Sequence, residues 1–164
     1  MLAGRVKTTG PYSWNGNANT IQTHLTSTFT RLRGRGLKTG EVDALVAYIT
    51  SLPPPPATAA ADQKKLARGH EIFLSGEAAC ATCHTGATLT DGVQHDVFSA
   101  KEIDDQKEFN TPSLHLVGGT GPYFHDGRYA TMADLLKSTS GTMGKTSHLS
   151  PADFDALQTY VESL

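Results

Sequence analysis

The stretch Cys80-Ala81-Thr82-Cys83-His84 contains both cysteines of this 164-residue chain and ends in a histidine. Two thiols three positions apart suit the two vinyl groups of one porphyrin, and the histidine that follows suits its iron. A structural zinc site usually requires four Cys or His ligands in two clusters, and a thioredoxin-like site follows a strand, whereas a helical pattern precedes this motif. The motif therefore predicts one haem c, attached through Cys80 and Cys83, with His84 as an axial ligand.

The sixth iron ligand is predicted to be Met143, in Thr142-Met143-Gly144. A thioether ligand raises the reduction potential, which suits electron transfer. The alternative is that Met143 only fills a gap in the core. Met132 competes for the role, but it opens a helix beside two leucines and is expected to be a packing residue. Four histidines are less favoured alternatives: His95, His115, His125 and His148.

The composition is that of a soluble globular protein, with 38% hydrophobic residues, 18% charged residues and a net charge of -2. The balanced charge gives no sign of a nucleic-acid partner. No apolar run approaches the roughly 20 residues that a membrane-spanning helix needs. Residues 1–10 lack the apolar core of a signal peptide, so we expect a mature or truncated form rather than a whole precursor.

The secondary structure is expected to be mainly helical. One helix is predicted over Asp62 to Ser75, from apolar residues at helical spacing and Asp62 as N-cap. Capping boxes at Ser150–Asp153 and Thr131–Asp134 predict a C-terminal helix and a short helix through Lys137. Another helix is expected near Glu41 to Ser51, whereas residues 86–127 are rich in Gly, Thr and Asp and predict loops with a short hairpin.

An internal repeat links the first 52 residues to the C-terminal part of the chain. Gly10-Pro11-Tyr12 matches Gly121-Pro122-Tyr123 at an offset of 111, and Asp43-Ala44-Leu45 matches Asp155-Ala156-Leu157 at an offset of 112. The simplest account is two tandem domains of one type, with the front of the first domain missing. We therefore predict a remnant of a preceding domain at 1–52, a semi-rigid Pro/Ala linker at 53–61 and a motif-bearing domain at 62–164.

The segment Tyr123-Phe124-His125-Asp126-Gly127 combines aromatic and polar residues. Here His125 either contacts a haem propionate or the electron path, or belongs to a turn with Asp126-Gly127 at its bend. Trp14 occupies the matching position in the repeat. Its expected role is buried packing, with assistance to electron transfer as the alternative.

These motifs resemble those of the bacterial di-haem cytochrome c peroxidases and the methylamine-utilisation di-haem proteins. The resemblance extends from about Leu66 to Leu164 and, through the repeat, to the first 52 residues. The segments that carry it, besides the C-x-x-C-H motif, are Thr90-Asp91-Gly92, His95-Asp96-Val97, Phe109 to Leu114, Thr120 to Gly127 and Thr142-Met143-Gly144.

The resemblance implies a class I cytochrome c-like helical haem domain with long loops, preceded by a helical arm from a second such domain. It implies His84 and Met143 as the axial pair and His125 as a residue behind the ligands. It also implies calcium at the carbonyls of Thr120 and Pro122, and a bacterial location in the periplasm or at the cell surface.

One departure from the family decides between functions. Members carry two C-x-x-C-H motifs and this chain carries one. The favoured function is therefore electron transfer by a single haem, with a redox partner protein or a second haem domain as partner. The alternatives are a fragment of a di-haem peroxidase-like enzyme, with peroxide or oxygen chemistry at the missing or an open haem, and a protein without haem.

Overall fold

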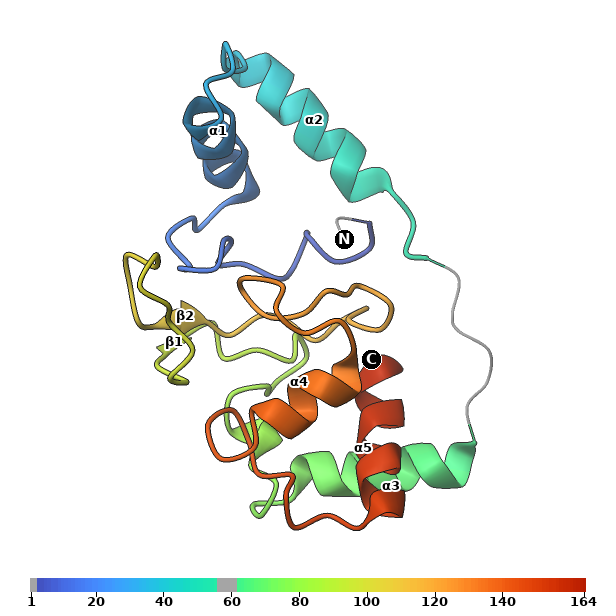
Figure 1. Ribbon diagram of the computed structural model, residues 1–164. Coiled ribbons are helices and arrows are strands. Elements are labelled where there is room, and N and C mark those ends of the chain that lie inside the picture. Colours follow the sequence, from blue (N-terminus) through green and yellow to red (C-terminus); the bar gives the residue numbers. More distant parts are fainter. Residues whose placement is uncertain (1–2, 56–61) are drawn as a thin grey trace.

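The computed structural model describes residues 3–55 and 62–164 (Figure 1). Within these residues the chain is mainly helical with long loops, and this confirms the predicted fold class. The elements are α1 (Ile21–Arg31), α2 (Thr39–Ser51), α3 (Gln63–Leu74), the 3-10 turn η1 (Cys80–Thr82), β1 (Gln94–His95), β2 (Phe109–Asn110), α4 (Met132–Ser138) and α5 (Pro151–Glu162).

The main core lies where α3 crosses α5 (Figure 1). Gly69 lets the helices meet, because a Cβ at this position would collide with the carbonyl of Ala156. Buried Phe73 and Leu157 fill the crossing. Ion pairs flank it, from Lys65 to Asp155 at 2.5 Å and from Arg68 to Asp153 at 2.6 Å.

The predicted helix starts are confirmed by their caps. Asp62 accepts a hydrogen bond from the amide of Lys64, Thr131 from that of Asp134, and Ser150 from that of Asp153. Each cap satisfies an amide that has no partner inside its helix. Met132 is 2% exposed in the core, which confirms its expected role as a packing residue.

Residues 3–52, called the arm below, have a smaller core of their own. Helices α1 and α2 pack together at the top of Figure 1, over a cluster of Val6, Ile21 and Ile49. Helix α2 agrees with the predicted helix near 41–51. No helix was assigned to α1 from the sequence, although its N-cap Thr20 matches Thr131 in the repeat.

The repeated sequences form the same local structures. An isolated bridge joins Tyr12 to Ala18, and the matching bridge joins Tyr123 to Tyr129. A cis Gly-Pro bond precedes each bridge, and each is followed by a Thr-capped helix. Helix α2 likewise corresponds to α5 at the offset of 112. The division into two domains stays a prediction.

The N-terminal stretch of the arm, before α1, lies on the loops of residues 62–164, called the motif segment below. The Arg5 guanidinium donates to the Ser113 carbonyl at 2.7 Å. The amide of Asn110 in β2 donates to the Trp14 carbonyl at 2.7 Å. Residues 53–55 of the predicted linker have no regular structure, and residues 56–61 lie outside the described residues.

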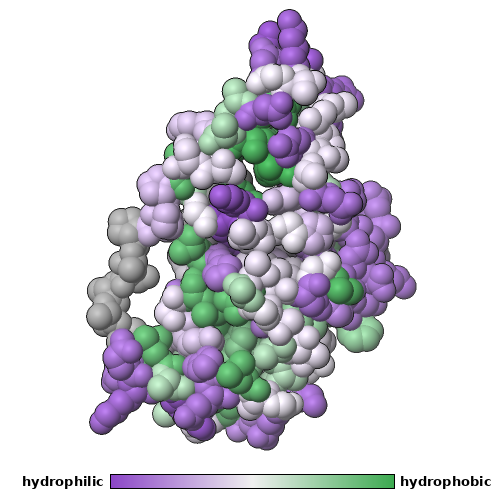
Figure 2. Space-filling model, turned by 180° about the vertical axis from the view of Figure 1, so that it is seen from behind, coloured by the Kyte–Doolittle hydropathy of each residue, from purple (hydrophilic) through white to green (hydrophobic). Residues whose placement is uncertain are grey.

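The surface is polar at the far end of the arm and more apolar near its middle. Figure 2 shows hydrophilic residues gathered over the turn between α1 and α2, with hydrophobic side chains at the surface below them. Arg31 ends α1, and the turn contains Arg33 and Arg35. Within the described residues, no helix is long and apolar enough to cross a membrane.

Candidate haem-attachment site

The motif begins directly after α3, in a tight turn. Ala79 has a left-handed backbone with φ of 59°, which ends the approach from α3 and starts η1. The amide of His84 donates to the Cys80 carbonyl at 3.1 Å, so the histidine folds back beside the first cysteine. Both cysteines carry free thiols and are half-buried. The turn thus presents two thiols and one imidazole within five residues.

The two thiols are held in their protonated form. Burial raises the pKa of Cys80 to about 11. Burial also raises the pKa of Cys83, and the carboxylate of Asp91 adds to the effect. Because the thiolate is the reactive form, both cysteines are poor nucleophiles and poor metal ligands in the folded chain at neutral pH.

The His84 ring is arranged as an iron ligand would be. Its Nδ1 donates to the Leu89 carbonyl at 3.3 Å, which fixes the tautomer with an unprotonated Nε2. Burial lowers the pKa of His84, so the ring is neutral at neutral pH. A ligand histidine normally donates its second ring N–H to a backbone carbonyl in this way. The donor set of Cys80, Cys83 and His84 therefore fits a covalently attached haem.

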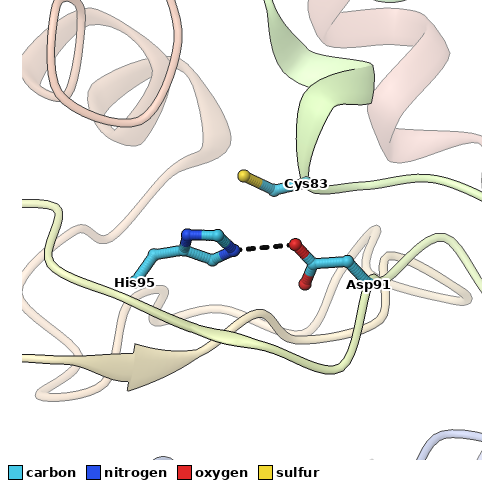
Figure 3. Close-up of side chains that lie close together, drawn as sticks. All are labelled: Cys83, Asp91 and His95. Atoms are coloured by element: carbon cyan, nitrogen blue, oxygen red, sulfur yellow. Dashed lines mark hydrogen bonds and ion pairs between the residues drawn. The ribbon is translucent and has the colours of Figure 1, made fainter.

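A second group of polar side chains lies beside Cys83 (Figure 3). Here His95 Nε2 donates to Asp91 Oδ2 at 2.7 Å, and the ligand atoms of Cys83, Asp91 and His95 all lie within 4.8 Å of one another. Burial opposes ionisation of Asp91, but hydrogen bonds from the Val93 amide and His95 lower its pKa below the usual value. A thioether at Cys83 removes its thiol from this group.

The loop that carries Met143 is brought to the motif. The amide of Lys145 donates to the Ala78 carbonyl at 2.9 Å, and a Cβ on Gly144 would lie 3.9 Å from the Cys80 sulfur. Met143 is half-buried and packs against the same core cluster as Cys80. The methionine favoured from the sequence thus lies in a loop next to the cysteine turn. Its role as the sixth ligand stays a prediction.

His125 occupies a buried aromatic site at β2. Its ring stacks on Phe109, with centroids 3.9 Å apart and planes 15° apart, and its Nε2 donates to Asp104 at 3.2 Å. Only 7% of the side chain is exposed. The arrangement fixes the ring between a strand and an acidic loop, and the proposed role near the haem stays a prediction.

Trp14, the counterpart of His125, corrects an expectation. Its side chain is 48% exposed, so the expected buried packing is wrong. Strand β2 contacts Trp14 through the backbone, where the Asn110 amide donates to the Trp14 carbonyl. The ring of His125, by contrast, stacks on the side chain of Phe109.

The remaining candidates already have other contacts. His115 Nε2 donates to the Ala87 carbonyl at 2.6 Å, and His148 lies 3.7 Å from Glu77. Thr120 donates its hydroxyl to the Val117 carbonyl at 2.7 Å, and Pro122 is exposed beside it. Calcium at these two residues stays a prediction.

Two acidic residues of the site were missed by reasoning from side-chain chemistry. Asp91 orients His95 beside Cys83, and Asp104 orients His125. Both belong to loops without hydrophobic periodicity. The only signal for Asp91 was its place in Thr90-Asp91-Gly92, among the motifs that carried the family resemblance.

The chain is similar in sequence to three known proteins. Hydrazine synthase subunit gamma of Kuenenia stuttgartiensis is 28% identical, over 59% of this chain and 40% of that protein. The methylamine utilization protein MauG of Methylorubrum extorquens is 32% identical, over 42% of this chain and 23% of that protein. Cytochrome-c peroxidase IdrP1 of Denitromonas iodatirespirans is 28% identical, over 51% and 34%. The match thus spans less than half the length of each relative.

Solved structures show the same fold. A structure of Kuenenia stuttgartiensis hydrazine synthase superposes with a TM-score of 0.80 at 21% identity, over 98% of this chain and 70% of that one. A MauG-like protein associated with microbial copper homeostasis superposes with a TM-score of 0.74 at 16% identity, over 99% and 71%. No family model matches the chain. Together the relatives confirm the resemblance that the motifs predicted.

Proposed function

The chain is a relative of the di-haem cytochrome c peroxidases and MauG proteins, and on this premise we propose that it transfers electrons through one covalently bound haem c. The observation that carries the proposal is the turn of Cys80, Cys83 and His84, with a neutral imidazole held by the Leu89 carbonyl. A haem in this turn supplies a one-electron couple.

The side chains of the turn have separate roles in this proposal. Cys80 and Cys83 would hold the haem through thioethers, and His84 Nε2 would bind its iron. The Leu89 carbonyl, by accepting from Nδ1, keeps Nε2 unprotonated. The Asp91–His95 pair lies beside Cys83 and would be a polar neighbour of a haem held by that residue.

Haem attachment is tested on chain matured in a host that makes c-type cytochromes. The purified, denatured protein should give a pyridine haemochrome and an intact mass one haem above the polypeptide. The double variant Cys80→Ala with Cys83→Ala should retain no haem after denaturation, whereas Thr82→Ser between the two cysteines should retain it. A chain that keeps no haem in the native sequence would refute the proposal.

Met143 is proposed as the sixth ligand because its loop lies against Ala78 and Cys80. The ferric protein should show the far-red absorption band of a methionine-ligated haem, and Met143→Ala should remove it. The matched control is Met132→Leu, because Met132 is a buried packing residue on α4. If the band survives Met143→Ala, the assignment is wrong.

A second candidate function follows from the relatives that are peroxidase-like, and from the repeat. In this reading the chain is part of a di-haem oxidoreductase with peroxide or oxygen chemistry at another haem or at an open one. Rapid cyanide binding to the ferric haem, or turnover of peroxide, would favour it. A haem inert to both leaves electron transfer alone.

Further parts of the proposal concern the surroundings of the protein. The partner is a redox protein or a second haem domain, and the location is periplasmic or at the bacterial cell surface, because covalent haem attachment takes place outside the cytoplasm. Calcium at the carbonyls of Thr120 and Pro122 is tested by chelation: a site of this kind predicts a lower melting temperature with EGTA that calcium restores.

A further inference from the structure

The loop that follows the C-x-x-C-H motif, residues 85–90, holds the imidazole of His84. The ring Nδ1 donates to the Leu89 carbonyl at 3.3 Å. Leu89 has a left-handed backbone with φ of 52°, a conformation that a residue other than glycine keeps only where its surroundings hold it. The orientation of the His84 ring therefore depends on what supports this loop.

The support comes from the stretch that follows β2, residues 111–115. The buried Ser113 donates its hydroxyl to the Thr88 carbonyl at 2.7 Å. His115 Nε2 donates to the Ala87 carbonyl at 2.6 Å. Both acceptors stand directly before the carbonyl that binds the imidazole. The stretch thus fixes the loop next to the hydrogen bond that orients the imidazole.

The same stretch also acts on the imidazole itself. Burial lowers the pKa of His84, and hydrogen bonding to the carbonyls of Leu89 and Pro112 opposes this effect. Pro112 directly precedes Ser113. A carbonyl that accepts from one nitrogen of a ligand histidine makes the other nitrogen a stronger donor to a metal. A displacement of this stretch would therefore change how strongly His84 Nε2 binds iron.

One cation of the arm holds the stretch from its other side. The Arg5 guanidinium donates to the Ser113 carbonyl at 2.7 Å, across 108 positions of sequence. The side chain is half-buried, and burial lowers the pKa of Arg5. A guanidinium nevertheless stays charged at neutral pH, and a charge-assisted hydrogen bond is stronger than a neutral one. Arg5 is thus placed to fix the backbone of Ser113.

We propose that Arg5 is a positioning residue for His84, and that the arm thereby sets the reduction potential of the haem. This inference rests on the proposed function. The route runs from Arg5 to the Ser113 carbonyl, and from the Ser113 hydroxyl to the loop whose Leu89 carbonyl accepts from the ring. While the route is intact, the hydrogen bond at Nδ1 makes Nε2 a better electron donor, which favours ferric iron and lowers the potential.

The first test is a redox titration of the haem-loaded chain. Arg5→Met should raise the midpoint potential, and Arg5→Lys, which keeps a cationic donor, should return it most of the way to the native value. Loss of charge alone has the opposite sign, because removing a nearby cation favours ferric iron. The matched control is Arg35→Met, since that arginine lies in the turn between α1 and α2 with 86% of its side chain exposed, and its potential should be native. A fall with Arg5→Met, or no change, would overturn the proposal.

The second test breaks the route one step closer to the loop. Ser113→Ala removes the hydroxyl that binds Thr88 and should also raise the potential. In that background Arg5→Met should add less than it does in the native chain, because two residues that act in series are not additive. Full additivity would mean two separate routes and would refute the assignment. Ser113→Ala carries the same sign test if Arg5→Met does not fold.

Hydrogen exchange shows whether the loop itself responds. The amides of Leu89 and Thr90 donate inside the loop, to the carbonyls of Gly86 and Thr85, and should exchange faster in Arg5→Met, whereas those of α5 should not change. Native exchange in the loop would contradict the positioning role. A native chain without haem refutes the proposed function. A haem-loaded chain whose potential and loop do not respond to Arg5 refutes this inference alone.

Discussion

Helices α5 and α2 share a sequence pattern but differ in their neighbours. In α5, Leu157 is fully buried in a core built with α3, whereas its counterpart Leu45 in α2 is half-buried beside α1. Repeated sequence therefore produces the same helix twice, but the central leucine is fully buried only in α5. The difference shows that the pattern fixes local structure, while stability depends on the surface that covers it.

The largest effect is expected from removing the central leucine of each helix. Leu157→Ala should lower the free energy of unfolding by about 2–5 kcal/mol, because it opens a cavity in a closed core. Leu45→Ala should cost clearly less, because its site is partly open to water. Urea unfolding of both variants measures the contrast, and equal losses would mean that α2 is as well covered as α5.

Replacing a helical glycine by alanine should change the stability in opposite directions in α3 and in α2. Gly69→Ala should destabilise by about 1–3 kcal/mol, because its Cβ would press on the Ala156 carbonyl. Gly40→Ala should raise stability by up to about 1 kcal/mol, because nothing lies within 4 Å of the added Cβ and alanine favours the helix. The corresponding position in α5, residue 152, is already an alanine. Thermal melts of the two variants would test the signs.

The smallest expected effect is on the pH dependence of stability. Hydrogen bonds from Arg68 and Ser150 lower the pKa of Asp153 below its ordinary value. A carboxylate with a lowered folded-state pKa contributes stability above its unfolded pKa, near 4, and loses it as the pH falls through the lower folded value. Asp153→Asn should therefore destabilise at pH 7, and its cost should shrink as the pH falls below about 4. Glu41→Gln is the comparison on α2, and a loss that did not shrink in acid would exclude the ion pair as its cause.

Much of the fold was readable from the sequence because its signals are local. The caps at Asp62, Thr131 and Ser150 predicted three helices, the first of them directly before the C-x-x-C-H motif. What was missed depends on contacts between distant loops. Helix α1 has a mixed, threonine-rich sequence, and the exposure of Trp14 depends on how β2 meets the arm.

The candidate site divides in the same way. Cys80, Cys83 and His84 are adjacent in sequence, so their chemistry could be predicted without a fold. Asp104 reaches His125 across 21 positions and belongs to a polar loop, so no periodicity marks it. Asp91 is only four positions from His95, but their contact depends on a loop conformation that sequence spacing does not determine.

The crossing of α3 with α5 has a consequence for the order of events during maturation. It joins residues more than 80 positions apart, such as Arg68 and Asp153, so it forms only after the C-terminal helix has been synthesised. In the folded chain burial raises the pKa of Cys80 to about 11, whereas a thiol in an unfolded chain has its ordinary acidity. We infer that haem is attached before folding buries the thiol. A chain that ends before Ser150 should then still acquire covalent haem, whereas a fully folded apo-chain should acquire it more slowly than a newly unfolded one.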